Sequence, residues 1–124
     1  MRDIKFRALG KDGKWVYYGT AITGTVDYLQ LRKETESQFT GLLDRQGVDI
    51  YEGDIITVRH KKGEYLIKEK PTTLYFSDGA FQFELLSERR EMFLFEVCNS
   101  SESIAISHTC EVIGNIYDNP ELLS

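Results

Sequence analysis

Short runs of alternating apolar and polar residues, separated by turn residues, cover most of this chain. Residues 4–9 alternate Ile, Phe and Ala with Lys and Arg, which predicts a first strand with one mostly polar face. The Lys-Asp-Gly-Lys tetrad at 11–14 is typical of a tight hairpin turn, because Asp-Gly tolerates positive φ. Residues 15–18, Trp-Val-Tyr-Tyr, are therefore expected to return as the partner strand.

Residues 38–58 hold the densest run of turn and strand signals. Asp-Arg-Gln-Gly at 44–47 and Glu-Gly-Asp at 52–54 each predict a tight reversal. Glycine reaches positive φ without a Cβ clash, and the aspartate can bond nearby backbone amides, so Gly53 and Asp54 can turn the chain sharply. The β-branched run at 55–58 then predicts a strand.

The same pattern of turn and strand signals continues to the C-terminus. Reversals are predicted at 61–64, 77–79 and 87–91, with strands at 65–67, 80–83, 92–97 and 111–117, and a helical turn follows Pro120. The pattern is weaker at 19–38, where 20–22 and 28–31 are candidate strands and 32–37 is expected to be a polar connector. No span of twelve or more residues has a clean helical period, so a mainly β fold with little helix is expected.

The composition indicates one globular domain spanning residues 1–124. A formal net charge of −5 argues against binding nucleic acid or anionic lipid over the whole surface. The N-terminus lacks the apolar core of a signal peptide, and no run approaches the length of a membrane span, so a cytoplasmic protein without membrane contact is expected. In that compartment Cys98 and Cys110 would stay as thiols.

Candidate catalytic and metal-binding sets are incomplete. The carboxylates Asp44, Asp49, Glu52 and Asp54 could offer oxygen ligands, but their spacing matches no calcium loop and turns recruit such residues. The nitrogen and sulfur ligands, His60, His108, Cys98 and Cys110, have the intervals of no zinc finger or ribbon. Without a nucleophile–base pair we expect no catalytic residues, no metal, no cofactor and no enzymatic activity.

Basic charge gathers in one predicted hairpin, residues 59–70. It holds five basic residues against two glutamates in an otherwise acidic chain. A basic hairpin with a tyrosine could follow a phosphate backbone and stack a base, whereas charged hairpins also serve to discourage strand addition. The candidate nucleic-acid residues are Arg59, Lys61, Lys62, Tyr65, Lys68 and Lys70.

Four segments, 1–8, 38–42, 50–55 and 112–122, together resemble the YopX family, whose small members are encoded mostly in phages and prophages of Firmicutes. The segments follow the family's order over nearly the whole chain. The resemblance implies an SH3-type barrel or roll over roughly residues 40–124 with additional N-terminal strands. It implies no reaction and no site residues, since the family has no established activity.

Two functions from different classes remain open. The first is a non-catalytic phage accessory protein that binds an unknown protein partner or itself. The second is a nucleic-acid-binding module that uses the 59–70 hairpin. We favour the first, because the chain has no assembled catalytic set and combines a 12% aromatic content with β-rich patterning.

Overall fold

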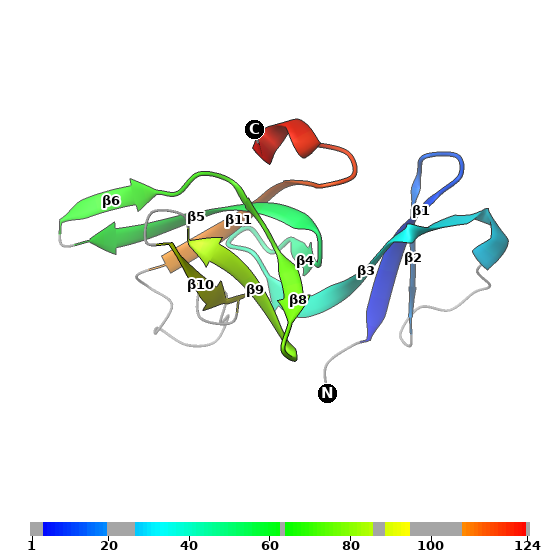
Figure 1. Ribbon diagram of the computed structural model, residues 1–124, viewed down its shortest axis with the longest axis horizontal. Coiled ribbons are helices and arrows are strands. Elements are labelled where there is room, and N and C mark those ends of the chain that lie inside the picture. The colour runs from blue at the N-terminus through cyan, green and yellow to red at the C-terminus, as the bar shows by residue number, and fades with distance from the viewer. Residues whose placement is uncertain (1–3, 20–26, 63, 86–88, 95–107, 124) are drawn as a thin grey trace.

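A computed structural model describes residues 4–19, 27–62, 64–85, 89–94 and 108–123, and its strands pair antiparallel (Figure 1). The elements in chain order are β1 (Lys5–Gly10), β2 (Trp15–Gly19), η1 (Tyr28–Gln30), β3 (Leu31–Leu43), β4 (Asp49–Tyr51), β5 (Asp54–Lys62), β6 (Tyr65–Lys68), β7 (Thr72–Thr73), β8 (Tyr75–Ser77), β9 (Ala80–Leu85), β10 (Arg90–Phe93), β11 (His108–Asn115) and η4 (Pro120–Leu123). The mainly β fold with little helix is confirmed, and the open, roll-like sheets agree with the expected barrel or roll.

The N-terminal sheet has the strand order β2-β1-β3-β4. The predicted hairpin is present: Leu9 pairs with Trp15, and Gly13 in the turn has φ +84°. Burial of Ala8, Tyr18 and Leu31 forms a small core on this sheet. Strand β1 differs from the prediction in one respect, because Arg7 on its supposedly polar face is buried.

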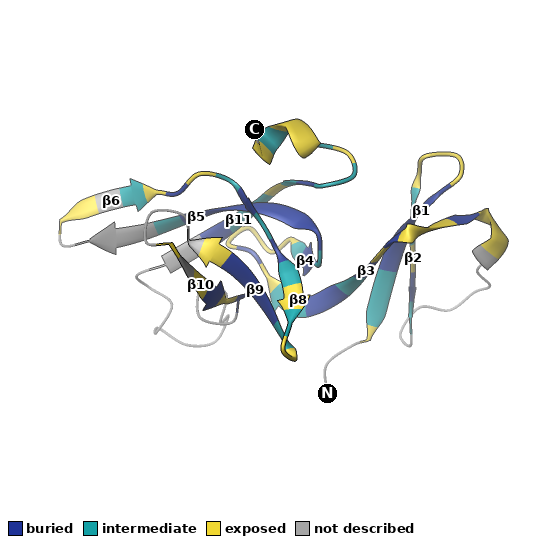
Figure 2. Cartoon of the chain, viewed as in Figure 1, coloured by how far each residue is buried: buried dark blue, intermediate teal, exposed yellow. Residues whose placement is uncertain are grey.

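The remaining strands form the larger lobe. One sheet has the order β11-β5-β6, with β7 also paired to β5, and the other has the order β10-β9-β8. Strand β5 lies at the centre of the first sheet, and Figure 2 shows its early part buried. The main core forms between these strands and comprises Ile50, Ile56, Val58, Leu74, Phe81, Phe83, Met92, Leu94 and Cys110.

Strand β3 joins the two lobes (Figure 1). It pairs with β1 through residues such as Ser37 and Gln38, and with β4 through Phe39 and Leu43. The expectation of a polar connector at 32–37 was therefore wrong, because Thr35 and Ser37 are buried in a strand that pairs with β1, while Arg32, Lys33, Glu34 and Glu36 stay exposed. The candidate strand at 28–31 is instead the short 3₁₀ turn η1 followed by the first residue of β3.

The predicted reversals in the large lobe are confirmed where the structure describes them. Gly47 and Gly53 have φ values of +83° and +84°, and the β8–β9 turn places Asp78 and Gly79 at φ 52° and 80°. The β5–β6 hairpin pairs Lys62 with Tyr65. Pro120 opens the expected C-terminal helical turn, η4.

Some predictions lie outside the described residues. These are the candidate strand at 20–22, the second half of the strand predicted at 92–97, and part of the 87–91 reversal. The single-domain assignment and the barrel limits of about 40–124 stay predictions. Among the described residues, no helix has the length and apolar character to span a membrane.

Candidate functional site

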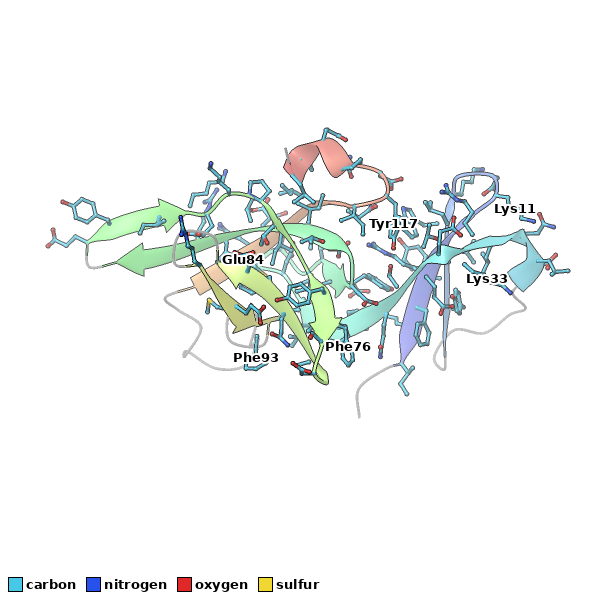
Figure 3. The ribbon with its side chains drawn as sticks, in the orientation of Figure 1. Lys11, Lys33, Phe76, Glu84, Phe93 and Tyr117 are labelled. Carbon is cyan, nitrogen blue, oxygen red and sulfur yellow. The ribbon has the colours of Figure 1, made fainter. Side chains whose placement is uncertain are left out.

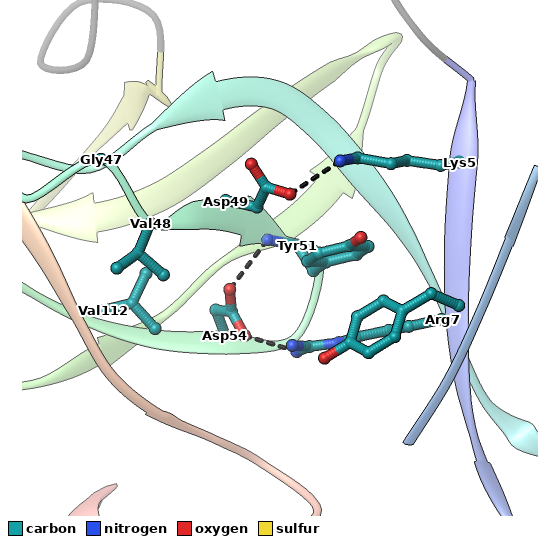
Figure 4. A pocket seen from close by; sticks show the side chains of 9 residues that line it. Lys5, Arg7, Gly47, Val48, Asp49, Tyr51, Asp54 and Val112 are labelled. Atoms are coloured by element: carbon teal, nitrogen blue, oxygen red, sulfur yellow. Dashed lines mark hydrogen bonds and ion pairs between the residues drawn. The ribbon is translucent and has the colours of Figure 1, made fainter. Parts of the chain in front are cut away.

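A cavity of about 520 Å³ lies where the N-terminal sheet meets the large lobe. We call it the junction pocket (Figure 4). Strand β1 contributes Lys5 and Arg7, whose side chains share one face because they are two positions apart in a strand. The other lining residues come from β2, β4, β5, β11 and the turn before β4; they are Tyr17, Gly47, Val48, Asp49, Tyr51, Asp54 and Val112.

The floor of the junction pocket is a buried ion pair. Arg7 Nη2 donates a hydrogen bond to Asp54 Oδ1, and the two side chains are only 9% and 2% exposed. Asp54 Oδ2 accepts a second hydrogen bond, from the backbone N–H of Tyr51 at 2.8 Å. Burial raises the pKa of the Asp54 carboxyl, while Arg7 and the Tyr51 N–H act in the opposite direction. Asp54, which was predicted as a turn residue, therefore also binds the N-terminal sheet through Arg7 of β1.

Aromatic rings hold the Arg7 guanidinium on both sides. Its Cζ lies 4.5 Å from the Trp15 ring centroid and 4.6 Å from that of Tyr51. The guanidinium is thus in cation–π distance of two rings in a poorly solvated position, where such contacts are strongest. Arg7 Nε is buried and has no acceptor among the described residues.

The upper wall of the pocket is more open. Lys5 Nζ donates to Asp49 Oδ2 at 2.7 Å, and these side chains are 21% and 39% exposed. Figure 4 shows the Tyr51 ring between this pair and the Arg7–Asp54 pair. Desolvation, helped by the nearby Asp49 carboxylate, raises the pKa of Tyr51 to about 12. The Tyr51 phenol is therefore neutral near physiological pH.

Three of the four carboxylates considered as metal ligands have hydrogen-bond or ion-pair partners that differ from one to the next. Asp49 and Asp54 each pair with a cation from β1. Asp44 is buried: its Oδ1 accepts from the N–H groups of Gln46 and Val48, and its Oδ2 from that of Val112. Asp44 therefore stabilises its turn, as its residue type suggested, with a carboxylate that is buried. No cluster of three or more His, Cys, Asp or Glu side chains suited to a metal ion occurs among the residues described.

The prediction that Cys110 is a free thiol is also wrong. Cys110 is 1% exposed, lies in the main core and is disulfide-bonded. Cys98 lies outside the described residues. The backbone of β5 pairs His60 with His108 of β11, which brings two of the four nitrogen and sulfur candidates to one register position.

The basic residues of the 59–70 segment are placed on strands β5 and β6 and the segment after them. Arg59 pairs in register with Lys68, so these two cations are direct cross-strand neighbours. Lys68 and Lys70 are exposed, and Tyr65 is 78% exposed. Lys61 and Lys62 pair with Leu66 and Tyr65 through the backbone, and their side chains lie outside what the structure describes.

A second cavity, of about 410 Å³, lies between β3, β8 and β9, and we call it the β3–β9 groove. Figure 3 shows Phe76 and Phe93 projecting on the same side of the large lobe, where the groove's residue Phe76 is 49% exposed. Phe76 packs edge-on against Phe81 at a centroid distance of 5.0 Å. None of the described residues that line the groove is charged; they are Gln38, Thr40, Gly41, Leu42, Phe76, Gly79, Ala80, Phe81 and Leu94.

Sequence reasoning missed the junction pocket altogether. The available signal was the pair of cations at alternate positions 5 and 7, which a strand projects from one face. The partners of these two cations could not be predicted from the sequence, since Asp49 and Asp54 follow more than forty residues later. The pocket draws residues from the first, third and fourth of the segments that carry the family resemblance.

Comparison with known proteins agrees with that resemblance. The crystal structure of protein EF1440 from Enterococcus faecalis is similar to this chain, with a TM-score of 0.60, 22% identity and full coverage of both chains, which supports the fold alone. None of the curated proteins matches. A sequence model described as YopX protein matches residues 4–124. This chain therefore belongs to the YopX family.

Proposed function

We propose that this chain is a non-catalytic accessory protein of a phage or prophage, which binds another protein or a second copy of itself. The β3–β9 groove is the observation that carries this proposal. Most of its described lining residues are apolar and none of them is charged, as in the centres of protein–protein interfaces. The SH3-type barrel assigned to residues 40–124 would be the scaffold for this surface.

Phe76 is the residue on which the groove argument depends most. A half-exposed phenylalanine at the rim of an apolar groove leaves hydrophobic surface in water, and covering it would be favourable. Aromatic residues are also enriched among those that dominate binding energy at interfaces. The groove would accept an apolar side chain from the partner, with Phe76 packing over it.

The test is affinity capture from the host bacterium with tagged protein, run with and without nuclease, alongside light scattering to measure oligomeric state. Phe76→Ser should abolish capture of the partner, or self-association, without unfolding the chain. Tyr65→Ser is the matched control, because it removes an exposed ring far from the groove lining. Loss of binding in both variants, or in neither, would remove the groove from the proposal.

Nucleic-acid binding by the basic hairpin is the second candidate. The observation that favours it is Tyr65, which is 78% exposed beside the cations of β5 and β6 and so could stack on a base. Opposing it, the chain outside residues 59–70 has a net charge of −8, since the hairpin contributes +3 to the total of −5. Capture that disappears after nuclease treatment would favour this candidate.

A further inference from the structure

The junction pocket combines features of a small-molecule site. Its volume of about 520 Å³ is in the range common for such sites. Tyr51 is 3% exposed, yet its hydroxyl oxygen is open to the cavity and makes no hydrogen bond to any residue that the structure describes. This hydroxyl is therefore free to bond with water or with an occupant of the cavity.

Charge in the pocket is balanced. Lys5 and Arg7 on the β1 side face Asp49 and Asp54 on the side of the large lobe, and both cations are paired with these carboxylates. Because the two cations and the two carboxylates cancel, the pocket gives a charged occupant no net attraction to offset the loss of its hydration. An uncharged occupant avoids that cost.

The pocket's walls favour an occupant with both donor and acceptor groups. The rings of Tyr17 and Tyr51 pack against each other at one side of the pocket, 5.9 Å apart between centroids and tilted by 59°, and Tyr17 is half exposed. The Tyr51 hydroxyl can donate, and the partly exposed Asp49 carboxylate can accept.

We propose that the junction pocket binds a small uncharged molecule through a planar amide group, whose carbonyl accepts a hydrogen bond from Tyr51 and whose N–H donates to Asp49. Two sources share this chemistry: the lactam edge of a nucleobase and a carboxamide such as that of glutamine. This site is separate from the β3–β9 groove, so the proposal does not depend on the proposed function.

Isothermal titration calorimetry on the full chain tests the proposal with two arms, the nucleosides uridine and inosine and the carboxamides acetamide and N-acetylglutamine amide. Sodium acetate and inorganic phosphate are the charged controls. Saturable binding is expected in at least one amide arm, and the arm that binds identifies the source. Saturation in neither arm at millimolar ligand, or equal binding of acetate or phosphate, would overturn the proposal.

Tyr51→Phe separates a direct contact from a structural role, because it removes the hydroxyl and keeps the ring. Affinity should fall about tenfold, the expected effect of one lost hydrogen bond in a closed site. Tyr65→Phe, which removes a hydroxyl from an exposed ring outside the pocket, should bind as the parent does. Thermal melts establish that both variants are folded. Unchanged affinity in a folded Tyr51→Phe would rule out the assigned contact.

Discussion

The two ends of strand β5 show how differently one strand can be held. At its start, residues Asp54 to Val58 are all buried and pair with β11 on one side, while Ile55 and Ile56 also pair with β7. At its end, Lys61 and Lys62 pair with β6, whose Tyr65 is 78% exposed. At the start of the strand a charge, that of Asp54, is enclosed by protein.

The turns at Gly53 and Gly47 differ in the same way, because the importance of a turn depends on what packs around it. Gly53 donates to the Leu74 carbonyl at 2.9 Å and accepts from the Ile116 N–H at 3.0 Å, so the turn ties three segments together. Gly47, with nearly the same φ, has nothing within 4 Å of where a Cβ would be. Residue type alone made the two turns look equivalent.

The largest effect is expected for Asp54→Ala. Removing one partner of a buried pair leaves the Arg7 charge uncompensated, which should lower the free energy of unfolding by about 3–5 kcal/mol. Urea denaturation measures it. Asp49→Ala is the matched control, because its pair with Lys5 is part exposed and should be worth about 1 kcal/mol or less. Equal losses in the two variants would show that enclosure does not distinguish these charges.

Next in size is Gly53→Val compared with Gly47→Val. Both place a β-branched residue at positive φ, which costs about 1–3 kcal/mol. At Gly53 the Cβ position is also in ordinary contact with Ile116 and Tyr117, whose atoms lie 3.6–3.7 Å away, so the γ-methyl groups of valine have less room there than at Gly47. Thermal melts should therefore give the lower midpoint for Gly53→Val. Identical midpoints would mean that backbone strain alone governs both turns.

A smaller effect is expected at alkaline pH. Because the pKa of Tyr51 is raised from 10.0 to about 12, the unfolded chain loses this proton first, and the stability that the neutral phenol contributes below pH 10 is lost as the pH rises toward 12. Ultraviolet titration should show a late-ionising tyrosine that is absent in Tyr51→Phe and that returns to its ordinary range in denaturant. A titration unaltered by Tyr51→Phe would place the late component elsewhere.

The smallest effect is expected at the far end of β5. Lys61→Glu together with Lys62→Glu should change the melting temperature little, since Glu64 and Tyr65 at the tip of the same hairpin are exposed and substitutions at exposed hairpin ends usually stay within about 0.5 kcal/mol. Fluorescence anisotropy with single- and double-stranded DNA and RNA at low salt should show no binding by either the parent chain or the double variant. Micromolar binding by the parent that vanishes in the double variant would make the hairpin the functional end of the strand.

Local chemistry was sufficient for the turns and for most strands. Asp-Gly at 12–13, Gly47, Gly53 and Asp78-Gly79 are residue types that tolerate positive φ, and each stands at a reversal. The strand from 32 to 37 was missed because its pattern is polar, and it forms only because β1 offers a partner across which Thr35 and Ser37 are buried. The family membership could also be read from short segments of sequence.

The candidate site was decided by the tertiary structure. The sequence predicts that Lys5 and Arg7 share one face of a strand. Whether that face meets solvent or carboxylates depends on how β1 is placed against β4 and β5. The same holds for Asp44, whose role came from the Val112 N–H of a strand far along the chain. Alternation along a strand reports only which residues share a face. What lies opposite that face is a property of chain segments that are distant in sequence, so only the folded structure could reveal it.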